Sequence, residues 1–165
     1  MKKFLLLFTA LLFAHSPLLQ AEDKAPEISK DSVTLEVFAG PENSEETVYA
    51  KLRIAGMYAL DKVSIGKDAS DAEGKKISAK TPRGTFQVTG MAHVNEQKYL
   101  IFEKEKNIGI RIQKKGEELG KRNTTKAIAV PEDTFHELHE AYLAGEKVFV
   151  IINNEIFPKE KIPTN

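Results

Sequence analysis

Few side chains in this sequence could act as a nucleophile or a metal ligand, and fewer still lie at intervals that would bring them together. The chain contains no cysteine, so it has neither a thiol nucleophile nor a disulfide. His136 and His139 are three residues apart, which on a helix places them on one face, where Glu132 or Glu140 could join them around a metal ion. Metal sites usually need three or four ligands, and these residues are equally typical of a solvated helix face. We therefore expect no metal and no other cofactor.

Two hydroxyl side chains, Thr124 and Thr125, are the remaining candidate nucleophiles. A threonine hydroxyl needs an adjacent base, and the local sequence offers none. His93 stands alone between short apolar runs and is more typical of a surface residue than of a catalytic base. The threonines most simply indicate a polar loop, although an enzyme with unusual chemistry stays open at this point.

Basic residues gather in the long polar segment 114–126. Lys114 and Lys115 begin it, and Lys121 and Arg122 follow. Such cations could bind the carboxylates of a peptide ligand, or they could simply be solvated. The whole chain carries 24 basic and 24 acidic residues, so its charge gives no reason to expect binding to nucleic acid or to an anionic membrane surface.

Alternating apolar residues predict mostly β-structure. The expected strands cover residues 33–37, 48–54, 60–65, 85–90, 99–103, 108–112, 127–130 and 148–152. The last strand is almost entirely apolar, which is typical of a central strand. Several short strands with one late helix predict a mainly β fold, a β-sandwich with a single C-terminal helix packed on it.

The helix is expected over residues 131–144. Pro131 suits the first helical position, the two acidic residues after it complement the positive end of the helix dipole, and Gly145 suits the residue that ends the helix. An apolar stripe of Phe135, Leu138 and Tyr142 predicts which side of the helix faces the core.

The first 21 residues have the pattern of a signal peptide. Two lysines precede an apolar run, and a small residue, Ala21, stands at the expected cleavage site. We expect a flexible lead-in over residues 22–31, one domain over residues 32–153 and an extended tail over residues 154–165. This organisation predicts an exported protein, periplasmic or extracellular, with no membrane span after cleavage.

Three stretches carry a resemblance to a known family. Residues 63–67 read VSIGK, residues 81–88 read TPRGTFQV, and residues 127–133 lead from a short strand into the helix. In this order they resemble the "V-S-x-G-K … T-P-x-G-T-F-x-[IV]" pair and the closing strand–helix–strand of the L,D-transpeptidase catalytic domain. The resemblance covers roughly residues 33–152 and implies that family's β-sandwich.

The resemblance also implies where the family's reactive groups would stand. Members use a cysteine in an "S-H-G-C-[IV]-R-[LM]" motif to attack a peptide carbonyl of peptidoglycan, with histidine as base and a supporting arginine. That motif falls on residues 124–130. Ala127 then takes the place of the nucleophile, Thr125 that of the histidine and Ala129 that of the arginine, while Arg111 takes the place of a second histidine. An alanine has no group that could be activated.

The resemblance therefore predicts a catalytically inactive L,D-transpeptidase-like protein, a binding or scaffold module of the cell wall. Its partners would be peptidoglycan stem peptides or a cell-wall enzyme, and its expected binding residues are Arg111, Lys121, Arg122 and Lys126. Two alternatives stay open. One is an active enzyme that uses a threonine or a histidine-bound metal, and the other is a structural envelope protein without a ligand.

Overall fold

The computed structural model describes residues 28–29, 31–41, 44–67, 69–70, 76–77, 80–103, 108–125 and 127–162. The strands in these ranges are β1 (Val33–Phe38), β2 (Tyr49–Ile54), β3 (Met57–Lys62), β4 (Ala69–Ser70), β5 (Lys76–Ile77), β6 (Gly84–Gln87), β7 (Gly90–Val94), β8 (Gln97–Glu103), β9 (Ile108–Ile112), β10 (Ala127–Val130) and β11 (Val148–Asn153). The helices are α1 (Glu132–Leu143) and the short 3-10 helix η1 (Lys159–Lys161).

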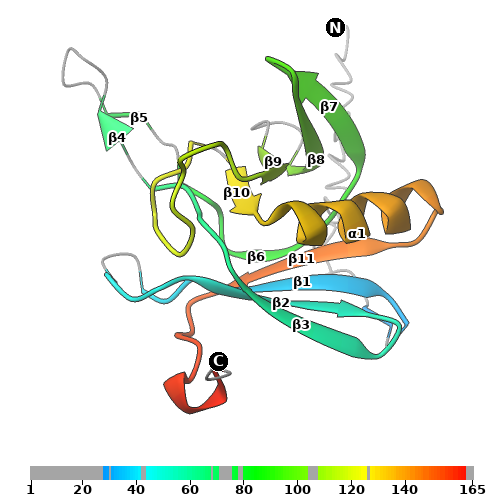
Figure 1. Ribbon diagram of the computed structural model, residues 1–165, viewed down its shortest axis with the longest axis horizontal. Helices are drawn as coiled ribbons and strands as arrows, with labels where there is room; N and C mark the ends of the chain where they lie inside the picture. Colours follow the sequence, from blue (N-terminus) through cyan, green and yellow to red (C-terminus); the bar gives the residue numbers. More distant parts are fainter. Residues whose placement is uncertain are drawn as a thin grey trace, which may run out of the picture.

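Two sheets face each other with α1 between them (Figure 1). The larger sheet has the order β3-β2-β1-β11-β6, and the smaller has the order β10-β9-β8-β7. Helix α1 contacts β9 of one sheet and β11 of the other, so it bridges the two layers. The mainly β sandwich with one helix that the sequence predicts is confirmed.

The prediction that the last strand is central is also confirmed, because β11 lies between β1 and β6. It pairs in parallel with β1, from Val33 opposite Val148 onward, and antiparallel with β6. The strand is buried on both sides of the sheet, since Val150 and Phe149 point to opposite faces and both are buried. A strand with two buried faces needs a nearly continuous apolar sequence.

Helix α1 follows the predicted pattern closely. Phe135 and Leu138 are buried in the core, as are Thr134 and Ala141, whereas Tyr142 is half-buried at the margin. Gly145 ends the helix with a φ of 82°, a left-handed conformation that favours glycine. The main body of the core consists of aliphatic side chains from the inner faces of both sheets and from this helix.

Two hairpins are tighter than the sequence suggests. The third strand, expected over residues 60–65, begins at Met57, because Ala55 and Gly56 both have positive φ, at 47° and 80°, and reverse the chain in two residues. Asn95 and Glu96 do the same between β7 and β8. A two-residue turn with positive φ at both positions matches the twist of the paired strands. Neither turn has the asparagine–glycine sequence that usually predicts this geometry.

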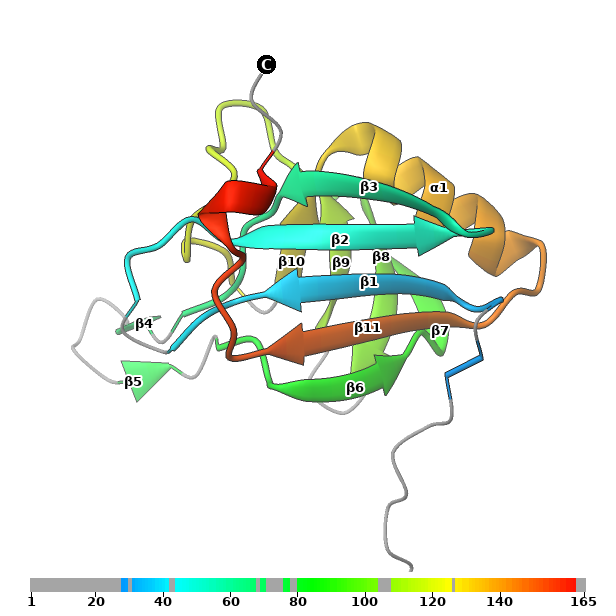
Figure 2. The same ribbon diagram turned by 90° about the horizontal axis from the view of Figure 1, so that it is seen from below.

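The tail also differs from the extended coil expected over residues 154–165. Phe157 packs on the outer face of the larger sheet, with its ring 5.0 Å from that of Phe38 and 5.7 Å from that of Tyr49. One turn of 3-10 helix, η1, follows (Figure 2). The aromatic contacts hold the tail against the sheet.

Some predictions fall on residues that the structure does not describe. The predicted signal peptide over residues 1–21, most of the predicted lead-in and the side chain of Lys126 lie outside the described residues. Among the residues that are described, no helix has the length and apolar composition needed to cross a membrane.

Candidate functional site

The three stretches that carry the family resemblance, residues 63–67, 81–88 and 127–133, lie close together in the structure. The backbone N–H of Gly66 donates a hydrogen bond to Oγ1 of Thr81 at 2.7 Å, which joins the VSIGK segment to the TPRG turn. The N–H of Thr124 donates to the carbonyl of Ile65 at 3.2 Å, which joins the same segment to the chain just before β10. Residues 65 and 66 therefore connect the other two segments into one structural unit.

Of the four positions that the resemblance assigns to reactive groups, three lie together on one face of the smaller sheet, whereas Thr125 precedes β10. Ala127 is opposite Gly109, and Ala129 is opposite Arg111, in the parallel pairing of β10 with β9. Their neighbours Ile128 and Ile110 point the other way, into the core. These three aligned positions thus share the face that points away from the core.

This face is closed around Ala127. Ala127 is 1% exposed, Ala129 is 0% exposed and Arg111 is 5% exposed. A Cβ atom built on Gly109 would lie 3.1 Å from Cδ1 of Ile101, so the Ile101 side chain occupies the space beside the aligned nucleophile position. Thr124 is buried, and its hydroxyl donates to the carbonyl of Ala127, whereas Thr125 is exposed. Ala127 itself is therefore buried rather than presented to solvent.

Arg111 is engaged within the protein. Its guanidinium forms two hydrogen bonds of 2.6 Å to the two carboxylate oxygens of Glu117, and Nη1 also donates to the carbonyl of Ile112 at 3.0 Å. The side chains of the pair are 6% and 12% exposed. Such a two-pronged, shielded ion pair is the geometry in which arginine binds a carboxylate most strongly.

The ion pair fixes the loop that follows β9. Glu117 also accepts a hydrogen bond from the N–H of Lys114 at 2.9 Å, and its carbonyl accepts one from the side chain of Gln113. Further along, the N–H of Gly120 donates to the carbonyl of Val63, and the carbonyl of Gly120 accepts from the N–H of Val48. The loop over residues 113–123 is therefore tied to β9 near one end and to residues that flank β2 and β3 near the other.

The ion pair predicts a specific acid sensitivity. The hydrogen bond from Arg111 lowers the pKa of the Glu117 carboxyl below its ordinary value of 4.5, against the opposing effect of burial. A lowered folded-state pKa means that this stabilisation is fully present above pH 4.5 and is lost as the pH falls through the folded-state value. In thermal unfolding measured from pH 7 to pH 3, the loss of stability at the acid end should be smaller in Glu117→Gln than in the unmodified protein. Equal acid losses in both proteins would contradict this role.

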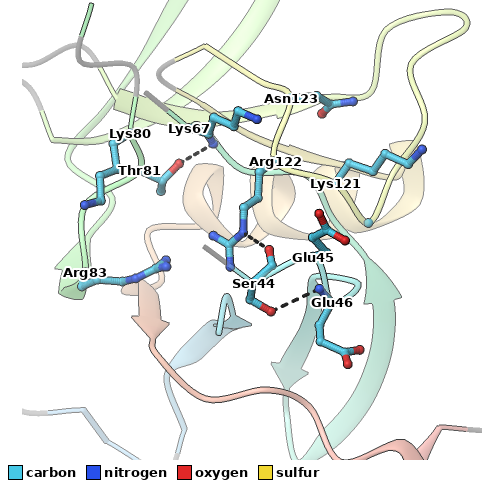
Figure 3. A pocket seen from close by; sticks show the side chains of 12 residues that line it. Ser44, Glu45, Glu46, Lys67, Lys80, Thr81, Arg83, Lys121, Arg122 and Asn123 are labelled. Carbon is cyan, nitrogen blue, oxygen red and sulfur yellow. Dashed lines mark hydrogen bonds between the residues drawn. The ribbon is translucent and has the colours of Figure 1, made fainter. Parts of the chain in front are cut away.

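A pocket rich in basic side chains opens beside the closed face (Figure 3). It has a volume of about 570 Å³, and we call it the basic pocket. Among the described residues that line it, five are basic and two are acidic. The basic residues are Lys67, Lys80, Arg83, Lys121 and Arg122, and the acidic ones are Glu45 and Glu46.

The two arginines build one wall of the basic pocket. Arg122 donates hydrogen bonds to the carbonyls of Ala39, Pro41 and Ser44, and Arg83 donates to the carbonyl of Gly40 at 3.0 Å. These bonds hold the segment that carries Ser44 and the two glutamates against the rest of the site. The lysines come from or next to the stretches that carry the family resemblance, and from the loop over residues 113–123.

The expected binding residues thus separate into two groups. Lys121 and Arg122 line the basic pocket, whereas Arg111 is buried in its ion pair and does not line it. Lys67, Lys80 and Arg83 also line the pocket and were not among the expected binding residues. Their positions in the sequence could have identified them as pocket residues. Lys67 ends the VSIGK stretch, Lys80 precedes the TPRG turn and Arg83 lies within it.

The two helix histidines line a different surface pocket, between α1 and the β7–β8 hairpin, together with Glu132 and Asp133. Within the described part of the chain, no three histidine, cysteine or acidic side chains are arranged to hold a metal ion. His139 instead stacks on Phe135, with ring centroids 5.9 Å apart.

Comparison with solved structures relates this fold to an L,D-transpeptidase. The chain is similar to the L,D-transpeptidase (residues 123–326) from Xylanimonas cellulosilytica, with a TM-score of 0.53 and 14% sequence identity over 78% of this chain. It covers 63% of that chain, which is less than two thirds of its length. No protein-family model matches the sequence, and no curated protein sequence matches it. The fold is therefore L,D-transpeptidase-like.

Proposed function

We propose that this protein is an exported, catalytically inactive member of the L,D-transpeptidase fold that binds anionic groups of the cell wall in its basic pocket. The observation that carries the proposal is Ala127, an unreactive residue at the aligned nucleophile position, enclosed within a fold that otherwise resembles the enzyme. Export rests on the signal-peptide pattern of the first 21 residues.

Loss of activity follows from the side chains at the aligned positions. Acyl transfer by this route needs a nucleophile, a base within hydrogen-bond reach and donors for the oxyanion. Ala127 supplies no nucleophile, and Arg111, in place of a histidine, stays protonated and cannot accept a proton. The pair of Arg111 with Glu117 stabilises the loop instead, which gives the former site a structural role.

The ligand class follows from the lining of the basic pocket. Five basic residues against two acidic ones give the pocket a positive character in a chain whose formal net charge is zero. Carboxylates are the anionic groups of peptidoglycan stem peptides, and arginine and lysine bind them through charge-assisted hydrogen bonds. Exposed lysines such as Lys67 and Lys121 can meet such a ligand at the mouth of the pocket.

The first test addresses reactivity. Intact-mass spectrometry after incubation with a carbapenem should show an unchanged mass, because no side chain at Ala127 can be acylated. Ala127→Cys alone should also stay unmodified at neutral pH, since a thiol in this enclosed position lacks a histidine base and its pKa is not lowered. An adduct on the unmodified protein would overturn the assignment as inactive.

The second test addresses binding. Co-sedimentation with purified sacculi should be clear at low ionic strength and much weaker at high salt, because exposed charges are screened over a Debye length of about 8 Å at physiological ionic strength. A variant with both Lys67→Gln and Lys121→Gln should lose most of the low-salt binding. The matched control is Lys147→Gln, an exposed lysine that precedes β11, whereas the basic pocket lies near the other end of that strand.

A structural role without a small ligand is the second candidate. It is favoured by the closure of the face around Ala127, where the alanines and Arg111 are at most 5% exposed. Absence of co-sedimentation at low salt would contradict binding to the cell wall and would favour a structural role or a protein partner. Retained binding in the double lysine variant would place the cell-wall contact elsewhere on the surface.

A further inference from the structure

The outer face of the larger sheet is turned toward the viewer in Figure 2. The lining residues of a second hollow place it on this face. One part of this face is covered by the tail, where Phe157 packs on Phe38 and Tyr49. Beyond the tail, Thr34, Lys51 and Arg53 help to line an open hollow of about 260 Å³. No residue lines both this hollow, which we call the outer-face pocket, and the basic pocket.

Two cations meet in the outer-face pocket. Lys51 and Arg53 are two residues apart on β2, so their side chains point to the same face of the sheet. The Lys51 ammonium lies 4.0 Å from the ring centroid of Tyr58 on β3. Nη2 of Arg53 donates to Oγ1 of Thr34 at 3.2 Å and to the carbonyl of Ser29 at 3.3 Å. Lys51 and Arg53 are thereby held in place by uncharged groups.

These two charges are not neutralised by an ion pair. Among the described residues, neither Lys51 nor Arg53 has a carboxylate within salt-bridge distance, and Nε of Arg53 is buried without a hydrogen-bond partner. Glu36 is opposite Lys51 in the β1–β2 register, but its carboxylate accepts a hydrogen bond from Asn153 instead. The described residues of the pocket therefore carry two positive charges and one negative charge, which suits a ligand with a single negative charge.

The rest of the lining is apolar. Ile28 and Ile151 form part of the wall, and the Tyr58 ring, 61% exposed, forms another part. A volume of about 260 Å³ lies below the range of roughly 300–1,000 Å³ that holds drug-sized ligands, so it suits one residue-sized group. Because β3 is the edge strand of its sheet, a longer ligand could continue past Tyr58 into solvent.

We propose that the outer-face pocket binds the C-terminal carboxylate of a peptide chain that ends in an apolar residue. The carboxylate would lie between Lys51 and Arg53, and the last side chain would lie against Ile28, Ile151 and Tyr58. Capture of a chain-terminal carboxylate by fixed donors is a recurrent mode of peptide recognition. The carboxylate of Glu36 disfavours a doubly charged group such as a phosphate. This inference does not depend on the function of the basic pocket.

The test is a titration of the full protein followed by NMR. The probe is N-acetyl-leucine, and the matched control is its amide, N-acetyl-leucinamide, which has the same body without the charge. Carboxylate-dependent shifts at the backbone amides of Lys51, Arg53 and Tyr58, without shifts at Lys121, are expected. A tripeptide that ends in the same leucine should bind more tightly than N-acetyl-leucine. Equal affinities would indicate that the ligand is a small free carboxylate and would overturn the assignment to a peptide.

Variants then locate the site. Arg53→Gln should weaken binding of the tripeptide about tenfold or more, because it removes a charge-assisted donor, and Lys51→Gln should also weaken it. Lys98→Gln, an exposed lysine on the other sheet, should leave binding unchanged. If Arg53→Gln unfolds, Tyr58→Leu, which keeps the backbone and both cations, should still weaken binding. Equal binding of acid and amide, or unaltered binding in Lys51→Gln and Tyr58→Leu, would overturn the proposal.

Discussion

Leu138→Asp should unfold the domain or leave it only marginally stable. Leu138 is 0% exposed and lies in the core beside α1 neighbours such as Phe135. The change replaces a packed aliphatic group by a buried carboxylate without a partner, a class of substitution that costs more than about 4 kcal/mol. Because domains have total stabilities of about 5–15 kcal/mol, circular dichroism and thermal unfolding should show a large loss of structure at 25 °C.

The same helix provides a matched control. Leu143→Asp makes the identical chemical change at a side chain that is 56% exposed, so its effect on the free energy of unfolding should stay within about 0.5 kcal/mol. Two equally destabilised variants would mean that helix propensity, not burial, determines the effect. An unchanged melting temperature in Leu138→Asp would mean that this side of α1 does not face the core.

Arg111→Leu should destabilise the protein by about 3 kcal/mol. The change leaves the Glu117 carboxylate, only 12% exposed, without its counter-ion, and breaking one side of a buried pair is strongly unfavourable. Arg111 is also one of the expected binding residues, so this measurement tests its structural role directly. Chemical denaturation provides the measurement.

A double-mutant cycle isolates the pair itself. Arg111→Leu combined with Glu117→Leu should be less destabilising than the sum of the two single changes, with a coupling of at least about 1 kcal/mol. The control pair is Lys121 with Glu118, which has the same 2.6 Å separation but side chains that are 56% and 70% exposed. Its coupling should be below about 1 kcal/mol. Additive effects at Arg111 and Glu117 would contradict the clamp on the loop.

The loop that the Arg111–Glu117 pair holds in place also contributes to the basic pocket. The loop that Glu117 anchors also supplies Lys121 and Arg122 to the basic pocket. A variant in which the clamp is broken but the fold survives, such as Glu117→Gln, should therefore bind sacculi less well than the unmodified protein. Weaker binding in Glu117→Gln would show that the ion pair supports the proposed binding surface, and unchanged binding would show that it does not.

Much of the fold is predictable from the sequence, because local patterns dominate in its most regular parts. The apolar run of β11, the alternation in β9 and the helix between Pro131 and Gly145 all have strong local signals. The start of β3 was missed because its turn uses Ala55 and Gly56, and an alanine at a φ of 47° has no sequence signature. The packing of Phe157 on the sheet was missed because a single aromatic residue has no periodicity.

The absence of cysteine chemistry can be read directly from the composition, since the chain contains no cysteine. The roles of the charged side chains, in contrast, became visible only once the chain was folded. Arg111 and Arg122 are indistinguishable as letters, yet one is 5% exposed in an ion pair with Glu117 and the other lines a pocket. The free energy of a charge depends on its solvent exposure and its partners, and those come from strands and loops that are far apart in the chain.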